Sequence, residues 1–152
     1  MPHAISIAPP RLTLTYWGKV SAQDLLDVTA SVSEQLPPGE FDVLADSVSI
    51  RGLAIAPDEM DAILDATLRV VRAIGRGRTA FLIREEDRAI GTLFLVRLRQ
   101  ALTAYDLPVR VFELFTSQEE ALAWLAASPT ALRWSEANPR QDPTDPGPDP
   151  TP

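Results

Sequence analysis

The chain has 152 residues, 45% of them apolar and 23% charged, and its 21 acidic side chains against 14 basic ones give a net charge of -7. This length fits one globular domain with an ordinary hydrophobic core, since such a chain buries roughly two-thirds of the surface that it exposes when unfolded. The absence of cysteine excludes disulfides and thiolate metal sites, and His3 and Lys19 are the only histidine and lysine available for catalysis or metal binding.

The charge and the apolar segments also bear on partners and location. A negative net charge offers no electrostatic basis for binding nucleic acid or an anionic membrane surface. No stretch reaches the roughly 18 apolar residues of a membrane span, and the first ten residues lack the basic and apolar regions of a signal peptide. We therefore expect a cytoplasmic protein that is not an enzyme and that needs no cofactor or metal ion.

The N-terminal part of the chain is expected to form two strands and a helix. Short apolar runs at residues 5–7 and 11–16 flank a Pro-Pro pair, and their nearness favours an antiparallel pair. Ser21 stands at an N-cap position three residues before Asp24. Apolar residues then recur at helical spacing as far as Leu36, so the sequence predicts a helix there.

Helices and strands alternate in the rest of the domain. Apolar runs of strand length occur at residues 41–45, 79–83 and 109–114. Longer runs with helical spacing occur at residues 57–74, 87–104 and 117–127, and Ser117 with Glu120 is typical of a capping box. Strands that whole helices separate pair in parallel. The sequence therefore predicts an α/β fold: a mixed β-sheet with an N-terminal antiparallel strand pair, parallel strands and about four helices.

The C-terminal residues differ in composition from the rest of the chain. Seven of the 14 prolines lie between Pro129 and Pro152, and the last eleven residues carry no aliphatic side chain. Such a segment cannot offset the entropy lost on ordering. We predict a domain over residues 1–128 and a disordered Pro/Asp-rich tail over residues 129–152, with Leu132 and Trp134 as the last side chains able to pack on the domain.

Charged clusters give the first candidate sites. Arg69, Arg72 and Arg76 recur three and four residues apart, so they share one side of the helix at 57–74 and are candidate anion-binding residues. A solvated helix surface is the simpler interpretation of the same spacing. Asp58 and the acidic residues after it lie in the first turns of that helix, where they stabilise the helix dipole without any further role.

The segment between the strand at 41–45 and the following helix is expected to be a loop, from Ser47 to Ala56. It follows the carboxyl end of a strand in a parallel sheet, which is the edge where ligands and partners gather. We therefore regard Ser47 and Ser49 as candidate contact residues, although serines are common in loops without any function.

Several motifs in this order resemble the SpoIIAA-like family. They are Phe-Asp-Val-Leu-Ala-Asp-Ser at 41–47, Leu-Ala-Ile-Ala-Pro-Asp-Glu-Met at 53–60, Val-Arg-Val-Phe at 109–112 and Ser-Gln-Glu-Glu-Ala-Leu-Ala-Trp-Leu at 117–125. This family comprises small bacterial proteins similar to the STAS domain of anti-sigma factor antagonists, and it is grouped with the CRAL-TRIO lipid-carrier fold. The last motif is the most specific of the four.

The resemblance implies an interaction or regulatory module without catalysis. In antagonist STAS domains, a serine or threonine at the start of the second helix is phosphorylated, and the phosphate releases the partner. Here the corresponding residues are Ala54, Ile55 and Ala56, which carry no hydroxyl. We therefore expect no phosphorylation switch at that position.

Two functions from different classes follow. The first is a protein-interaction module in bacterial signalling or stress regulation, whose partner-binding residues would be Asp46, Ser47, Ser49, Arg51, Ile55 and Asp58. The alternative, implied by the CRAL-TRIO kinship, is a small-molecule or lipid binder with an apolar pocket beside the helix at 87–104. A deep apolar cavity would favour the second function. Whether the protein forms a homodimer is left open.

Overall fold

A five-stranded sheet forms the centre of the molecule in a computed structural model that describes residues 3–107 and 110–138. In spatial order, which is also chain order, the strands are β1 (His3–Ala8), β2 (Arg11–Ser21), β3 (Asp42–Ala54), β4 (Gly77–Leu82) and β5 (Arg110–Phe115). β1 and β2 pair antiparallel, and all other neighbours pair in parallel. The predicted mixed sheet is therefore confirmed.

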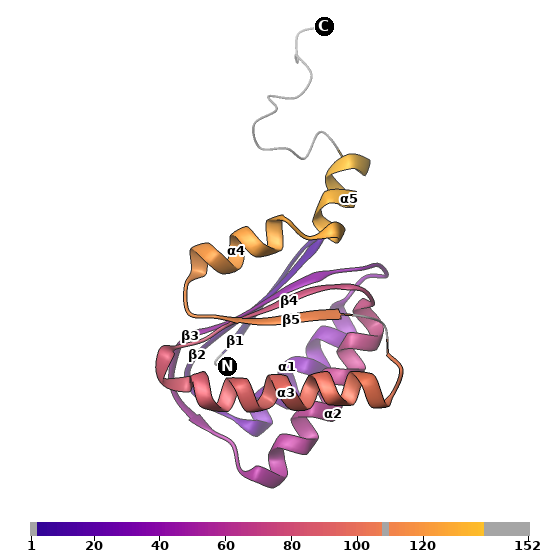
Figure 1. The fold of residues 1–152 in the computed structure, drawn as a ribbon. Helices are drawn as coiled ribbons and strands as arrows, with labels where there is room; N and C mark the ends of the chain where they lie inside the picture. The colour runs from indigo at the N-terminus through magenta and orange to yellow at the C-terminus, as the bar shows by residue number, and fades with distance from the viewer. Residues whose placement is uncertain (1–2, 108–109, 139–152) are drawn as a thin grey trace, which may run out of the picture.

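Helices cover both faces of this sheet (Figure 1). On one face lie α1 (Ala22–Gln35), α2 (Pro57–Ile74) and α3 (Arg88–Ala104), the last preceded by the short 3-10 helix η1 (Glu85–Asp87). On the other face lies α4 (Gln118–Ala126), followed by α5 (Pro129–Ala137). The result is a three-layer α/β sandwich, with five α-helices in the described residues where the sequence predicted about four.

The helix starts agree with the capping chemistry of the sequence. Ser21 Oγ accepts a hydrogen bond from the Asp24 amide at 3.2 Å, and Asp24 Oδ2 accepts one from the Ser21 amide at 2.8 Å, so this capping box is confirmed. These bonds lower the pKa of Asp24 because they stabilise its carboxylate. At α4, Ser117 Oγ accepts from the Glu120 amide at 3.3 Å.

The hydrophobic core lies on both faces of the sheet. On the face of the three long helices, one cluster joins β2 and β3 to α1, and another joins β4 and β5 to α2 and α3. On the opposite face, Leu44, Ala80 and Leu82 pack against Ala121 and Leu125 of α4. α2 buries seven residues: Met60, Ile63, Leu64, Ala66, Leu68, Val71 and Ile74.

The predicted loop from Ser47 to Ala56 is wrong over most of its length. β3 continues to Ala54 because β2 also continues, to Ser21, and offers it a parallel partner over residues 17–21. Register shifts after Thr15 and after Gly18 accommodate the pairing, and Gly18 has a φ of 70°. Both extensions depend on a neighbouring strand, which the local sequence does not reveal.

The predicted boundary at residue 128 is also wrong, because residues 129–137 form α5. Ser128 caps this helix by accepting from the Ala131 amide at 3.0 Å, and Pro129 occupies its first turn, where a missing amide costs nothing. Thr130 is buried, Trp134 is half-buried and Leu132 is exposed. The rest of the predicted tail, residues 139–152, lies outside the described residues.

Candidate functional site

A cavity of about 200 Å³ lies between the sheet and the layer of α1, α2 and α3. Its walls come from four strands, β2 to β5, and from all three helices. Almost all of the lining side chains are apolar, and representative ones are Leu12, Ile50, Met60, Ile63, Phe94 and Leu114. Because the walls cross four neighbouring strands, the cavity extends over three strand spacings, roughly 14 Å.

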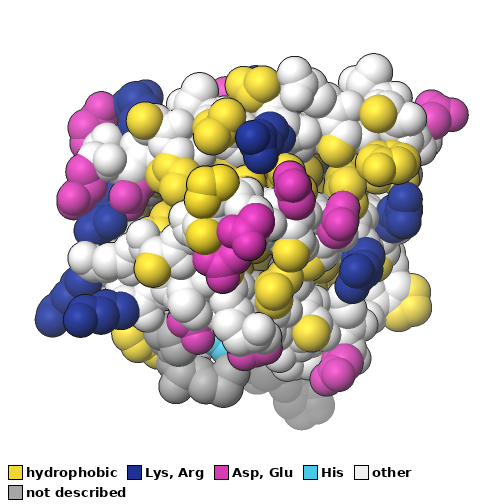
Figure 2. Space-filling model, turned by 90° about the horizontal axis from the view of Figure 1, so that it is seen from below, with side chains coloured by type: hydrophobic (Ala, Val, Ile, Leu, Met, Phe, Trp, Pro, Cys, Tyr) yellow, Lys and Arg dark blue, Asp and Glu magenta, His cyan; other side chains and the backbone are white. Residues whose placement is uncertain are grey.

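α3 contributes fewer buried side chains to the helix layer than α2 does. In contrast to the seven buried residues of α2, α3 buries only Leu95 and Leu98. Gly91 lets the first part of α3 approach the sheet, since a Cβ atom there would lie 3.0 Å from Ile83 Cδ1. Beyond this contact Phe94 is only half-buried, so free volume remains beneath the helix. Seen from the helix side, hydrophobic side chains show between charged ones (Figure 2).

Three phenylalanines form one wall of the cavity. Phe81 and Phe94 meet edge to face with ring centroids 5.9 Å apart, and Phe81 stacks on Phe112 at 6.0 Å. These are favourable aromatic geometries, worth about 0.5 to 1.5 kcal/mol for each pair. All three phenylalanines pack in the hydrophobic cluster that borders the cavity.

The polar lining groups are few, and most of their hydrogen-bonding capacity is used. Thr29 and Thr67 donate to carbonyl oxygens of their own helices at 2.8 Å, and Thr79 Oγ1 accepts from Arg110 at 2.8 Å. Asp87 is held by Arg84 through two bonds of 2.7 and 3.1 Å. Tyr16 is 7% exposed, and burial raises its pKa well above the usual range.

The residues predicted to bind a partner differ in exposure, and their role stays a prediction. Ser47 and Ile55 are half-buried and line the cavity. Ser49, Arg51 and Asp58 are exposed, and Asp46 is half-buried with its Oδ1 accepting from the Val48 amide at 3.1 Å.

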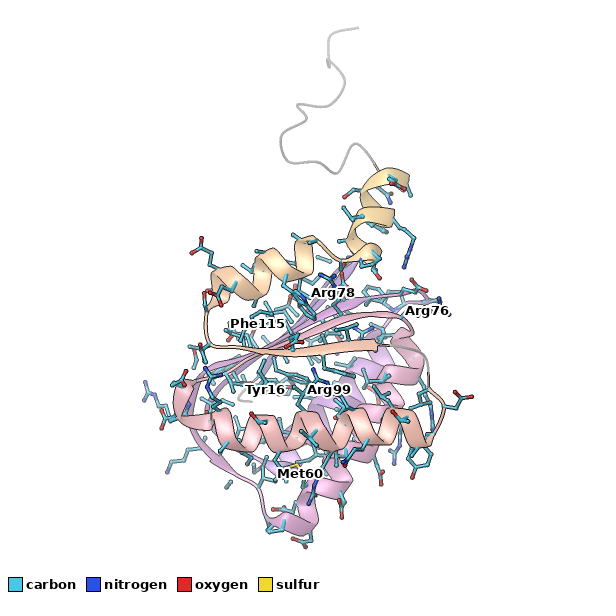
Figure 3. All side chains as sticks on the ribbon, in the orientation of Figure 1. Tyr16, Met60, Arg76, Arg78, Arg99 and Phe115 are labelled. Atoms are coloured by element: carbon cyan, nitrogen blue, oxygen red, sulfur yellow. The ribbon has the colours of Figure 1, made fainter. Side chains whose placement is uncertain are left out.

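The candidate anion-binding arginines Arg69, Arg72 and Arg76 are all exposed. Arg69 borders a shallow hollow between α1 and α2, together with Asp65. Arg76 follows the end of α2 and lies at the margin of the molecule (Figure 3). No hydrogen bond or ion pair among the described residues involves their side chains, and their anion-binding role stays a prediction.

The opposite face of the sheet holds an aromatic contact between α4 and β5. Trp124 of α4 is half-buried, its ring 5.4 Å from that of Phe115 and 4.9 Å from the guanidinium carbon of Arg78. Arg78 also donates to the Trp124 carbonyl oxygen at 2.7 Å. Figure 3 shows Arg78 and Phe115 close to α4. This face is therefore filled by its own side chains.

Sequence reasoning missed a buried polar cluster formed by Asp42, Thr79, Arg110 and Ser128, which are at most 5% exposed. Arg110 donates to Thr79 and to the carbonyl oxygens of Phe41, Gly75 and Arg78, and Ser128 donates to Asp42. Burial lowers the pKa of Arg110 to about 10. The cluster lies at the amino ends of β3, β4 and β5, where Thr79 also lines the cavity, and it holds α5 to the sheet.

Comparison with known proteins identifies the fold. No family model and no curated protein matches the chain. A solved structure does: an uncharacterized protein of the DUF3478 family with a SpoIIAA-like fold, from Shewanella loihica PV-4, at a TM-score of 0.50. This chain has a SpoIIAA-like fold. The match covers 81% of this chain and 91% of that one at 20% identity, so it confirms the fold expected from the motifs and carries no function with it.

Two further observations concern the described part of the SpoIIAA-like chain. Its helices are all too short or too polar to cross a membrane. Within residues 3–107 and 110–138, no three His, Asp or Glu side chains lie together in a way that could hold a metal ion.

Proposed function

We propose that this SpoIIAA-like domain binds a small apolar molecule in the cavity between its sheet and helices α1 to α3. The observation that carries the proposal is the cavity itself, about 200 Å³ and almost wholly apolar. An apolar cavity of about 150 Å³ already suffices to bind benzene. The proposed site is therefore large enough for a compact aromatic molecule or a short alkyl chain.

The energetics of the cavity support an occupant. A ligand that covers the apolar lining removes it from water, and each Å² of apolar surface removed from water contributes roughly 25 cal/mol.

The proposed role is binding without catalysis. Among the described residues that line the cavity, the ionisable side chains are Tyr16 and Asp87. The pKa of Tyr16 is raised by burial, and the Asp87 carboxylate is occupied by Arg84. No nucleophile paired with a base is present in this set.

Ligand-induced stabilisation tests the proposal. We expect toluene or octane at about 100 times its dissociation constant to raise the thermal midpoint of the full chain by roughly 5 to 10 °C. Ala45→Met places a larger side chain in the cavity and should reduce this shift. Ala73→Met is the matched control, because Ala73 is exposed on α2 and does not line the cavity, and this variant should show the full wild-type shift. A wild-type midpoint that no apolar compound raises would contradict the proposal.

A protein-interaction module is the second candidate, and one observation favours it. Trp17 and Val48 are 42% and 45% exposed where β2 and β3 extend beyond β4. Exposed large apolar side chains are typical of contact surfaces. Affinity capture of partner proteins with the wild-type chain and with the Trp17→Ser and Val48→Ser variants tests this candidate. A partner should be lost from both variants, and one that both variants retain does not use this surface.

A further inference from the structure

We propose that the cavity selects an uncharged apolar molecule that carries one hydrogen-bonding oxygen, and that this oxygen pairs with the Tyr16 hydroxyl. This inference rests on the proposed function and names the chemical class of its ligand. An alcohol or ketone with a short alkyl chain has the required chemistry, whereas a fatty acid anion and an alkylammonium ion do not.

Among the described residues that line the cavity, Tyr16 supplies the one deeply buried hydroxyl that makes no hydrogen bond to another described residue. It belongs to β2, is more than nine-tenths buried and lines the cavity, and Figure 3 places it between the sheet and the helix layer. None of the hydrogen bonds among residues 3–107 and 110–138 involves its hydroxyl. That oxygen is not completely enclosed by protein atoms.

An unpaired hydroxyl in such a place is costly, which is why a ligand oxygen there would be favoured. The raised pKa of Tyr16 keeps the hydroxyl protonated, so it can donate to a carbonyl or alcohol oxygen. The threonines that line the cavity already donate to helix carbonyls or accept from Arg110. Ser47 is the remaining lining hydroxyl with no side-chain hydrogen bond, and it is only half-buried.

The charges around the cavity account for the exclusion of ions. The described lining residues include no lysine or arginine, so a buried carboxylate would find no cation. The one charged lining residue is Asp87, and both of its oxygens accept from Arg84. An ammonium group would therefore find no free carboxylate. Burial of an unpaired ion outweighs the gain from its alkyl chain.

A matched ligand series tests the inference. Octane, 1-octanol, octanoate and octylammonium have chains of similar length, and the last two are charged at about pH 8. We expect calorimetric titration of the full chain to show 1-octanol binding at least tenfold more tightly than either ion. Tyr16→Phe should weaken 1-octanol binding about fivefold, the worth of one hydrogen bond, and leave octane binding unchanged. Tyr105→Phe is the matched control, because Tyr105 is exposed and does not line the cavity, and this variant should retain the wild-type affinity for 1-octanol.

The outcomes separate this inference from the proposed function. If octane binds but octanoate binds as tightly as 1-octanol, or if Tyr16→Phe leaves the affinity for 1-octanol unchanged, the inference is wrong and the apolar site stands. Loss of 1-octanol binding in Ser47→Ala but not in Tyr16→Phe would overturn it in the same way. If none of the four compounds binds, both proposals are wrong.

Discussion

At the scale of single residues, the buried polar cluster shows how few contacts hold distant parts of the chain together. Arg110 at the start of β5 reaches carbonyl oxygens that precede β3 and β4, and Asp42 accepts from the Arg78 amide and from Ser128. Buried charges are tolerated only where hydrogen bonds satisfy them. The cluster therefore permits no side chain at Gly77, where the backbone passes between these groups.

Gly77→Ala should destabilise the domain by about 2 to 4 kcal/mol. Its φ of 152° disfavours a side chain, and a Cβ atom would lie 2.8 Å from both Arg110 Nη1 and the Phe41 carbonyl oxygen. Gly52→Ala is the control, because its nearest contact is Lys19 Cγ at 3.7 Å, and it should change stability by less than about 0.5 kcal/mol. Urea melts of both variants measure the difference, and equal stabilities would show that the cluster yields to the added methyl group.

Trp124 is a second test at this scale. A fully buried tryptophan replaced by alanine costs about 3 to 5 kcal/mol, but Trp124 is half-buried, so we expect Trp124→Ala to cost roughly 2 to 3 kcal/mol through its lost contacts with Phe115 and Arg78. The exposed Trp17 is the comparison, and Trp17→Ala should cost less than about 1 kcal/mol. If denaturant melts show the larger loss at Trp17, these two contact assignments are wrong.

At the scale of elements, α5 differs from what its composition suggests. The sequence around α5 is rich in proline, but Pro129 is suited to the first turn of a helix. Ser128 caps α5, and its hydroxyl also donates a hydrogen bond to the buried Asp42. Arg133 of α5 also donates a hydrogen bond of 2.7 Å to the carboxylate of Glu40, which lies just before β3. α5 is therefore part of the folded domain.

Truncation separates α5 from the residues beyond it. A chain ending at residue 138 should keep the thermal midpoint of the full chain, since residues 3–138 contain every strand and helix described above. A chain ending at residue 128 should lose about 1 to 3 kcal/mol, because it lacks the buried Thr130 and the helix that Ser128 caps. Calorimetric midpoints measure both, and a loss of more than a few degrees in the longer chain would contradict the first expectation.

At the scale of the whole molecule, the layer of helices is unevenly attached to the sheet. α2 buries seven residues, whereas α3 buries two and leaves Leu93 and Val96 about half exposed above the cavity. Regions with few buried apolar contacts open at lower free energy than the core. α3 is therefore the element expected to move when a ligand enters.

Native-state hydrogen exchange tests this expectation. Amides of α3 should exchange through openings of lower free energy than amides of α2 and β3, and saturating 1-octanol should slow exchange in α3 more than in α1. Uniform protection across all three helices would contradict it. Ala45→Met without ligand is the control, because a partly filled cavity should slow α3 exchange by itself.

The sequence by itself determined most element types and the mixed sheet, because periodicity, caps and turn residues are properties of short stretches of sequence. The SpoIIAA-like fold was expected from the resemblance of four motifs to a known family, and the structural comparison confirms it. It did not determine the length of β2 and β3, the existence of α5 or the buried polar cluster. Each of these depends on a partner far along the chain, such as Asp42 for Ser128. The sequence also did not predict the size or the lining of the cavity. Apolar spacing marks which side chains face the interior, and only the tertiary packing of α3 decides that they leave a space between them.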